Sequence, residues 1–526
     1  MLPKTSAGRP QFSSHAGEAQ TYRVRTLLVF VILQCVLYGI DLKLLPMWGD
    51  ETFTVETVAE TPAQIVDIVR DDIHPPLYFL VAHWWSRIPI GSVPLVRLRA
   101  LSVLFALLTT VFIDLRWLLN TPPRLRNWFL LFWTFSPCLL LYCRMARSYS
   151  MQLFFATVAT WYVLRLTDDA AVWKNLAAFV AALGMLLYTH YLAGIAIWAG
   201  ANLLLVLSLL RGRSVWKTFL MSNALLAILY LPWLVTLSGA LNQWRHSQVY
   251  CLTGNIWAEQ VLKLCYWLYS FTFGESIPVW LLPVTLVLAL PCLWLFVSGA
   301  LLRREWLWPA LLAAALAFLG ATGWVSYPFM GARLLFLLPL FLLALAAGLT
   351  TKGRAGTVLG VILLAANLAG LWSYYEARDI LNAGYLVPNQ RIAMEIAQRS
   401  RSEDTIVWID TLSFDGSALE YYLPKGYRIR WLTSPETVAA ARAELNAGDI
   451  RHVWFVHSSH DLSPGHVFEE LGAQMAQTWS DHAVYSYVPF SPVHLEILRV
   501  LELLRHRDGN RPRLYLCEVW EYRRPH

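Results

Sequence analysis

Long apolar segments constrain this chain more than any other feature of its sequence. Mostly apolar stretches, some of them short, recur near 26–45, 95–118, 127–142, 151–166, 176–190, 192–210, 218–238, 279–301, 306–325, 333–350 and 356–374. About twenty apolar residues in a helix span the hydrocarbon core of a bilayer. Only 15% of the residues are charged, against about 25% in soluble domains. The sequence therefore predicts a polytopic α-helical membrane protein with about eleven transmembrane helices.

Basic residues predict how these helices are oriented. With the N-terminus inside, the cytoplasmic segments contain most of the loop Lys and Arg, among them Arg23, Arg25, Arg124 and Arg126, as the positive-inside rule expects. Eleven spans then place the C-terminal region outside. The net charge of +7 belongs largely to these loops, so no nucleic-acid partner is expected. No small-residue cleavage site follows the first apolar segment, so we expect a retained helix.

Composition divides the chain into three parts. Residues 1–25 form a cytoplasmic N-terminus, 26–375 a transmembrane domain with long outer loops at 46–94 and 239–278, and 376–526 a region where charges return. In this last region, alternating patterns predict strands at 405–409, 452–456, 483–488 and 514–519, and helices at 435–447 and 466–478. This mixture predicts a small extracytoplasmic α/β domain.

The first outer loop contains signals for two short helices. Thr61 can cap a helix that begins at Pro62, with Gln64 completing a capping box. The apolar face that follows predicts an interfacial helix lying on the membrane. Pro76 can open a second, aromatic-rich helix.

Two adjacent carboxylates follow the first apolar segment. Asp50 and Glu51 stand at its outer end, and Asp72 and His74 come about twenty residues later. The carboxylates could simply mark the outer boundary of a helix. The other interpretation is a general base or an ion ligand held at the membrane surface.

Several arginines are predicted on the outer face, against the positive-inside bias. Arg144 and Arg147 have two equally favoured partners there, namely the phosphates of outer-leaflet lipids or the phosphate of a bound substrate. Arg333 opens the tenth span from outside, where it could be a snorkelling anchor. That role is favoured more strongly for Arg97 and Arg99. His190 is expected to be a packed polar residue more often than a ligand.

Five motifs in this order resemble those of a known superfamily. They are Trp48–Glu51, Asp72–Phe79, Ala146–Tyr149, Thr189–Tyr191 and Arg333–Pro339. Over about residues 25–375 the chain resembles the membrane-embedded GT-C glycosyltransferases, in particular the protein O-mannosyltransferase-like branch (glycosyltransferase family 39-like) that includes bacterial aminoarabinose transferases. One departure is Leu334, which stands where relatives often carry Tyr.

The resemblance implies a glycosyltransferase that moves a sugar from a polyprenyl-phosphate donor, with inversion, to a lipid, polysaccharide or protein acceptor. The enzyme would lie in a bacterial inner membrane with its active site facing the periplasm or exterior. Asp50 would be the base that deprotonates the acceptor or a ligand that orients it, with help from Glu51. The donor phosphate would be held by Arg144, Arg147 and Arg333. Residues that orient the substrate or the loop would be Asp72, His74, Tyr78, His190 and Tyr191.

A metal and two other functions stay open at this point. Metal use varies in this superfamily, and a divalent cation at Asp50, Glu51 and His74 is one possibility. The main alternative function is a transporter or flippase for a lipid-linked sugar, which would place polar groups near the bilayer midplane. A second alternative is an inactive relative that serves as an assembly subunit, although the acidic pair is retained.

Overall fold

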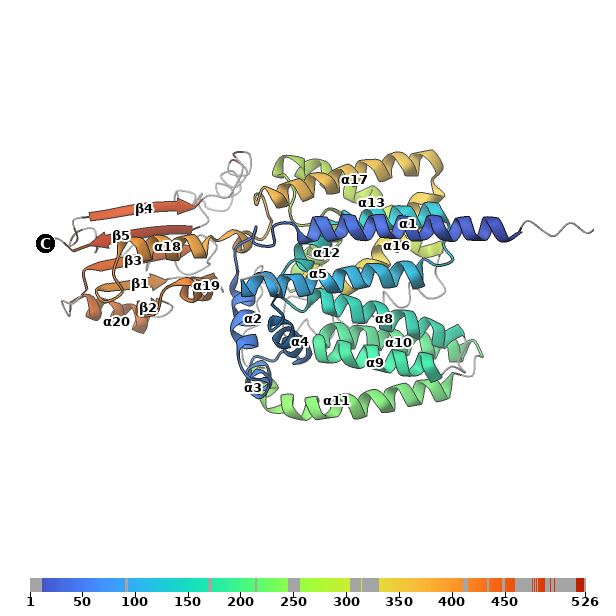
Figure 1. The fold of residues 1–526 in the computed structure, drawn as a ribbon, viewed down its shortest axis with the longest axis horizontal. Coiled ribbons are helices and arrows are strands. Elements are labelled where there is room, and N and C mark those ends of the chain that lie inside the picture. Colours follow the sequence, from blue (N-terminus) through green and yellow to red (C-terminus); the bar gives the residue numbers. More distant parts are fainter. Residues whose placement is uncertain are drawn as a thin grey trace, which may run out of the picture.

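Long helices lie side by side in a bundle, and a mixed sheet stands beyond one end of it (Figure 1). This computed structural model describes residues 12–89, 93–168, 173–212, 215–244, 256–302, 314, 331–409, 415–432, 435–446, 450–458, 475, 477, 479, 481–487, 492, 496 and 517–524. The bundle consists of α1 (Phe12–Gly39), α5 (Pro94–Phe112) with η1 (Ile113–Trp117), α6 (Pro123–Thr134), α7 (Pro137–Cys143), α8 (Tyr149–Asp168), α9 (Trp173–Thr189), α10 (Tyr191–Leu210), α11 (Trp216–Trp244), α12 (Ile256–Phe273), α13 (Leu282–Leu302), α15 (Gly331–Leu334), α16 (Leu338–Thr351) and α17 (Gly353–Tyr375).

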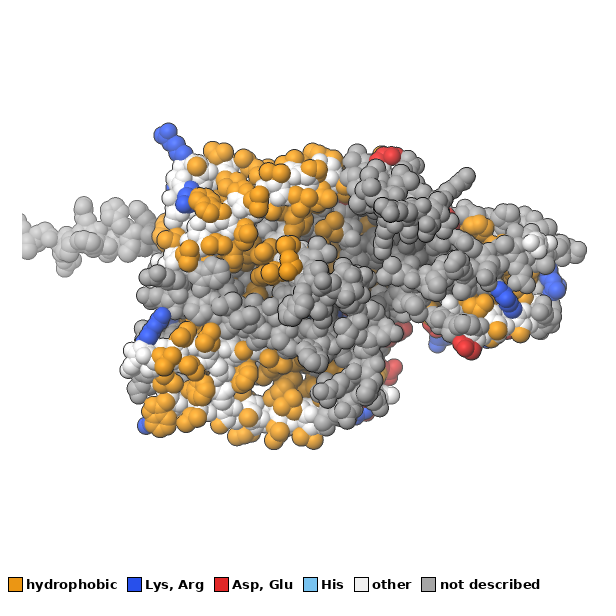
Figure 2. All heavy atoms as spheres, turned by 180° about the vertical axis from the view of Figure 1, so that it is seen from behind, with side chains coloured by type: hydrophobic (Ala, Val, Ile, Leu, Met, Phe, Trp, Pro, Cys, Tyr) orange, Lys and Arg blue, Asp and Glu red, His pale blue; other side chains and the backbone are white. Residues whose placement is uncertain are grey.

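The membrane character of the bundle is confirmed. Among the described residues, seven helical stretches are long and apolar enough to cross a bilayer: Gln20–Gly39, Pro94–Trp117, Tyr191–Leu210, Trp216–Leu237, Val279–Leu302, Gly331–Thr351 and Gly353–Tyr375. Each matches one of the expected spans. Hydrophobic side chains cover the flank of the bundle, and Lys and Arg lie at the end away from the sheet (Figure 2). The chain is therefore a multi-pass membrane protein.

Two expected segments differ in the structure, and a third falls almost wholly outside the described residues. The span expected at 127–142 is broken between α6 and α7, because Pro137 cannot continue a helix and the Ser136 hydroxyl accepts from the Leu139 amide at 3.2 Å to begin a new one. The outer loop expected at 239–278 contains the whole of α12. The span expected at 306–325 lies outside the described residues, apart from Ala314.

Three short helices of the first outer loop close the end of the bundle that faces the sheet (Figure 1). They are α2 (Gly49–Ala59), α3 (Pro62–Asp71) and α4 (Leu77–Ser86). The capping box predicted for α3 is confirmed, since Thr61 and Gln64 bond each other reciprocally. Ile65 and Val69 bury the apolar face of α3 against the rest of the loop. This packing holds α2, whose first turn carries Asp50 and Glu51, at the end of the bundle that faces the sheet.

The C-terminal region is a small α/β unit, as predicted. Its elements are α18 (Asn389–Arg399), β1 (Thr405–Ile409), α19 (Asp415–Tyr422), β2 (Arg428–Trp431), α20 (Pro435–Asn446), β3 (His452–Ser458), β4 (Asp481–Tyr487) and β5 (Cys517–Arg523). The strand order is β2-β1-β3-β5-β4. Strand β1 is parallel to its neighbours β2 and β3, whereas β5 runs antiparallel to its neighbours β3 and β4.

This region contains three elements that were not expected, namely α18, α19 and β2. The four-residue β2 was not predicted, because it is too short and too exposed to show an apolar pattern. The helix expected at 466–478 lies almost entirely outside the described residues. Helix α19 packs on α2, so the α/β unit touches the helix that carries the acidic pair.

Candidate functional site

Asp50 and Glu51 occupy the first turn of α2, yet their side chains have opposite surroundings. The Asp50 side chain is 27% exposed, whereas that of Glu51 is fully buried. Successive residues of a helix lie about 100° apart around its axis, so one carboxylate faces outward while the other enters the packed interior. This difference separates their chemical roles.

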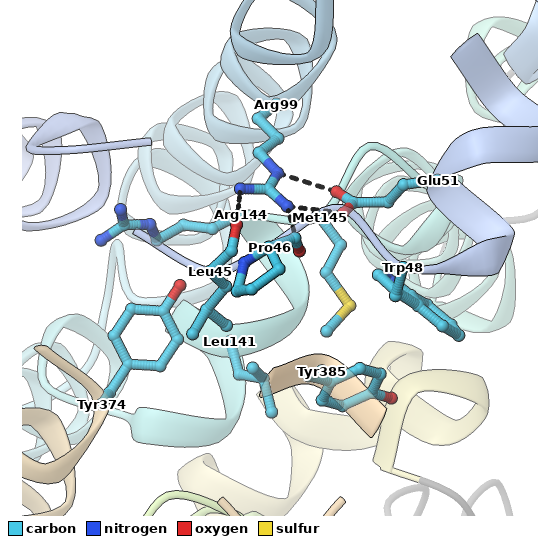
Figure 3. A pocket seen from close by; sticks show the side chains of 10 residues that line it. All are labelled: Leu45, Pro46, Trp48, Glu51, Arg99, Leu141, Arg144, Met145, Tyr374 and Tyr385. Carbon is cyan, nitrogen blue, oxygen red and sulfur yellow. Dashed lines mark hydrogen bonds and ion pairs between the residues drawn. The ribbon is translucent and has the colours of Figure 1, made fainter. Parts of the chain in front are cut away.

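Glu51 is paired with Arg99 from α5 (Figure 3). Arg99 Nε donates to Oε1 at 2.8 Å and Nη2 donates to Oε2 at 2.5 Å. The amide of Ala146 donates to Oε1 at 2.7 Å. Arg99 also donates to the carbonyls of Leu42, Leu45 and Pro46. A buried ion pair is tolerated only when its remaining donors and acceptors are satisfied in this way.

These contacts correct two expectations from the sequence. Arg99 is only 3% exposed, so it is an internal counter-ion and not a snorkelling anchor. Glu51 has both oxygens engaged by the protein, so the expected catalytic or metal-binding role does not fit its position. Glu51 instead fixes the turn on which Asp50 stands.

Arg144 makes most of its contacts with the scaffold, although its buried Nε, like that of Arg147, has no hydrogen-bond partner among the described residues. Its Nη1 donates to the Tyr375 hydroxyl at 2.9 Å, and its Nη2 donates to the carbonyls of Ile40 and Asp41. The guanidinium lies 5.1 Å from the ring of Tyr374. These contacts tie the end of α1 to the end of α17. In the small pocket of Figure 3, the Arg144 guanidinium is directed away from Glu51 and Trp48.

Arg147, in contrast, faces Asp50. Its Nη1 donates to the Asp50 carbonyl at 3.1 Å, its Nη2 lies 3.5 Å from Asp50 Oδ2, and Nη2 lies 3.2 Å from His74 Nε2. The residue is 7% exposed. Its buried Nε has no hydrogen-bond partner among the described residues. A buried guanidinium with a donor to spare is suited to bind an anion.

His74 connects Arg147 to Asp72. Its Nδ1 lies 2.8 Å from Asp72 Oδ2. A guanidinium can only donate hydrogen bonds, so Nε2 must accept from Arg147 and Nδ1 carries the proton that is donated to Asp72. Between them, Ile73 is buried and has a φ of 57°. A β-branched residue in this left-handed region costs about 1–3 kcal/mol, which the surrounding loop must offset to hold the Asp72–His74 pair in place.

A second group of residues lies around the same cluster. The nitrogen Nδ1 of His190 caps α10 by accepting from the Ala193 amide at 3.4 Å. Burial, with smaller effects from Arg333, His74 and Arg147, lowers the pKa of His190 to about 3. Burial, followed by the charge of Asp50, raises the pKa of Tyr149, and Arg147 and Arg333 oppose that rise. Arg333, His190 and Tyr149 are thus within electrostatic reach of the Asp50–Arg147–His74 cluster.

The remaining predicted residues pack around this cluster. Tyr78 is buried in α4 and its ring meets that of Phe79 edge-on at 5.4 Å. Tyr191 stacks against His190 with ring centroids 6.3 Å apart. The expected ion site at Asp50, Glu51 and His74 does not form, because Glu51 turns to Arg99 and Arg147 lies between the other two. Nowhere in the described part of the chain do three His, Cys, Asp or Glu side chains gather closely enough to hold an ion.

Sequence reasoning assigned no role to two residues near this site. Tyr149 belongs to the Ala146–Tyr149 motif, so the motif already contained the signal. Glu275 follows α12 and is 2% exposed. Its only signal was a lone carboxylate at the end of an aromatic, apolar segment, where a charge needs a specific partner.

Comparison with known proteins places this arrangement in a structural class. No family model matches the chain, and no curated protein matches it. ArnT from Cupriavidus metallidurans in the apo state superposes with a TM-score of 0.55 at 13% identity, covering 95% of this chain and 98% of that one. ArnT bound to undecaprenyl phosphate gives a TM-score of 0.51 at 14% identity, with 94% and 97% covered. The chain has the fold of the membrane-embedded GT-C glycosyltransferases.

The GT-C fold was expected from five short motifs, and that expectation is confirmed. An oligosaccharyltransferase from Archaeoglobus fulgidus shows a weaker likeness, with a TM-score of 0.47 at 12% identity over 88% of this chain and 72% of that one. Because the ArnT superpositions cover almost the full length of both chains, the likeness includes most of the C-terminal α/β unit of this GT-C fold.

Proposed function

We propose that this protein transfers a sugar from a polyprenyl-phosphate donor to an acceptor on the outer side of a bacterial inner membrane. The observation that carries the proposal is the Asp50–Arg147–His74 cluster at the outer end of a GT-C bundle. It combines a partly exposed carboxylate with a buried guanidinium that has an unused donor. The solved complex of ArnT with undecaprenyl phosphate supports a lipid phosphate as the donor's carrier.

In the proposed reaction, Asp50 is the general base. A hydroxyl or amine of the acceptor gives its proton to the Asp50 carboxylate as its oxygen or nitrogen bonds to the anomeric carbon. The bond between that carbon and the phosphate oxygen breaks on the opposite face, so the configuration inverts. The leaving polyprenyl phosphate takes the electron pair and needs charge stabilisation more than a proton.

Arg147 and Arg333 supply that stabilisation. Cationic donors aimed at a developing phosphate charge in a site shielded from water contribute a large part of such catalysis. Arg147 contacts Asp50, and the donor phosphate would compete for the same guanidinium and release the carboxylate for its role as base. The Asp72–His74 pair holds Arg147 from the other side. Tyr78, His190 and Tyr191 would orient the substrate beside this cluster.

A donor screen by mass spectrometry tests this function. Purified wild-type protein and Asp50→Asn are each incubated with a panel of polyprenyl-phosphate sugars and a membrane extract. The wild type should consume one sugar-lipid and add the matching mass to an acceptor, while Asp50→Asn binds the same donor and leaves it intact.

Asp71→Asn is the matched control, because Asp71 lies on the same outer loop with a 70% exposed side chain that pairs with Arg70. It should turn over at the wild-type rate. Failure of the wild type to consume any donor, or full turnover by Asp50→Asn, contradicts the proposal.

A further inference from the structure

Glu275 is a buried carboxylate that the proposed chemistry does not use. It follows α12 after Gly274, whose φ of 81° lets the chain turn sharply. The Tyr142 hydroxyl donates to its Oε1, and the Ser270 hydroxyl donates to the same oxygen at 3.0 Å. Burial raises the pKa of Glu275, while hydrogen bonds from Tyr142, Tyr266 and Ser270 oppose that rise. Such a group stays buried only because hydroxyl donors from two helices surround it.

The short helix α15 lies directly on this group. A Cβ added to Gly331 would come within 2.7 Å of Ser270 Oγ, 2.9 Å of a Tyr142 ring carbon and 3.0 Å of Glu275 Oε1. Only a residue without a side chain therefore allows this approach. On its other side α15 is held by α8, since Gln152 Nε2 donates to the Ala332 carbonyl at 2.9 Å. The backbone of α15 is clamped between these two contacts, and Arg333 is its next residue.

Glu275 also holds the segment that leads to the C-terminal domain. The Leu381 amide donates to its carbonyl at 2.8 Å, and Ser276 forms an isolated bridge with Ile380. A few residues later, the ring of Tyr385 meets Trp48 edge-on at 4.9 Å, directly before the acidic pair. Glu275 thus contacts both α15, which carries Arg333, and the segment that leads to Tyr385.

We propose that Glu275 is a positioning residue that, through Gly331, sets the Arg333 guanidinium against the donor phosphate. This inference rests on the proposed function, because it assumes that Arg333 meets that phosphate. Glu275 itself touches no reacting atom. Substitution of Glu275 should therefore weaken phosphate binding only in a protein that retains Arg333.

A double-mutant cycle tests this dependence. The affinity for a polyprenyl phosphate without sugar is measured for the wild type, Glu275→Gln, Arg333→Ala and the double variant. We expect each single variant to bind about tenfold more weakly, the scale of a lost hydrogen bond to a charged group. The double variant should bind no more weakly than Arg333→Ala alone, because residues that act through one another are not additive. Gly331→Ala, which displaces α15 without removing a carboxylate, should reproduce the loss.

Asp114→Asn is the control for a purely structural effect. Asp114 is also fully buried and pairs with Arg126 at 2.6 Å, on the far side of the bundle. This variant should lower the melting temperature and leave the lipid affinity unchanged. Additive losses of lipid affinity in Glu275→Gln and Arg333→Ala, or an unchanged affinity in Glu275→Gln, would overturn this inference but not the proposed function. Absence of lipid binding by the wild type overturns the proposed function and this inference with it.

Discussion

Glu51 and Arg99 form a bidentate ion pair that is sealed from solvent, with side-chain exposures of 0% and 4%. The pair joins the first turn of α2 to α5 and receives a further hydrogen bond from the Ala146 amide. It fixes the direction in which the next carboxylate, Asp50, leaves the helix. One member of the acidic pair is thus a structural element, and the other faces the cluster with Arg147.

Glu51→Gln should destabilise the protein strongly. The substitution leaves Arg99 buried without its counter-charge, and breaking a buried ion pair in this way costs about 3–5 kcal/mol. Thermal unfolding in detergent measures the loss. Asp50→Asn is the matched comparison on the neighbouring residue, and its melting temperature should stay close to that of the wild type. Equal losses in the two variants would contradict the separate roles assigned here.

Arg147 and Arg144 should respond differently to the same substitution. Arg147→Ala should weaken binding of a polyprenyl phosphate by about tenfold or more, because it removes a charged donor from the site. Arg144→Ala should lower the melting temperature, since it unties α1 from α17, while the folded protein keeps its lipid affinity. Titration with the lipid and thermal unfolding of both variants distinguish these outcomes, and the reverse pattern would place the phosphate beside Arg144.

His190 should make the fold sensitive to acid. Its pKa is lowered to about 3 from an ordinary value of 6.5, so between these pH values the unfolded chain binds a proton that the folded chain does not. Stability therefore falls as the pH drops below about 6.5, by on the order of 2 kcal/mol at pH 5. His190→Asn keeps a side chain that can cap α10 and should flatten this slope in melting curves from pH 5 to 7.5. An unchanged slope would show that other groups cause it.

Glu56 should weaken the contact between α2 and α19 as the pH rises. Partial desolvation, followed by the charge of Glu420, raises the pKa of Glu56, although its side chain is exposed. The folded state then retains a proton that the unfolded state loses just above pH 4.5, so this contribution favours the docked domain at low pH and disappears as Glu56 ionises.

Glu420→Gln removes the like charge across this contact. It should slow proteolysis of the segment between α17 and α18 at pH 7 and reduce the difference between pH 5 and pH 7. Glu60→Gln, just past the end of the same helix, is the control and should change neither rate. Identical cleavage of wild type and Glu420→Gln at both pH values would exclude repulsion between the two carboxylates.

Local signals predicted much of this structure. Apolar length predicted the membrane spans that match α5, α10, α11, α13 and α17, and the Thr61–Gln64 capping box predicted α3. These predictions succeed because helix formation depends on residues within a few positions of one another. The gathering of Asp50, Arg147, His190 and Arg333 at one end followed from the order of spans, which places their flanking loops on the same face.

The sequence by itself determined the multi-pass membrane character, the helical loop and the types of polar residue that gather at one end of the bundle. The tertiary structure alone decided which carboxylate and which arginines are available for chemistry. Asp50 and Glu51 are adjacent and chemically alike, and they are distinguished by partners far along the chain, Arg99 for Glu51 and Arg147 for Asp50. Glu275 acquires its role through Tyr142 and Gly331, which lie in distant segments. Electrostatic and steric partners across long separations depend on how the helices pack, and no local pattern encodes that packing.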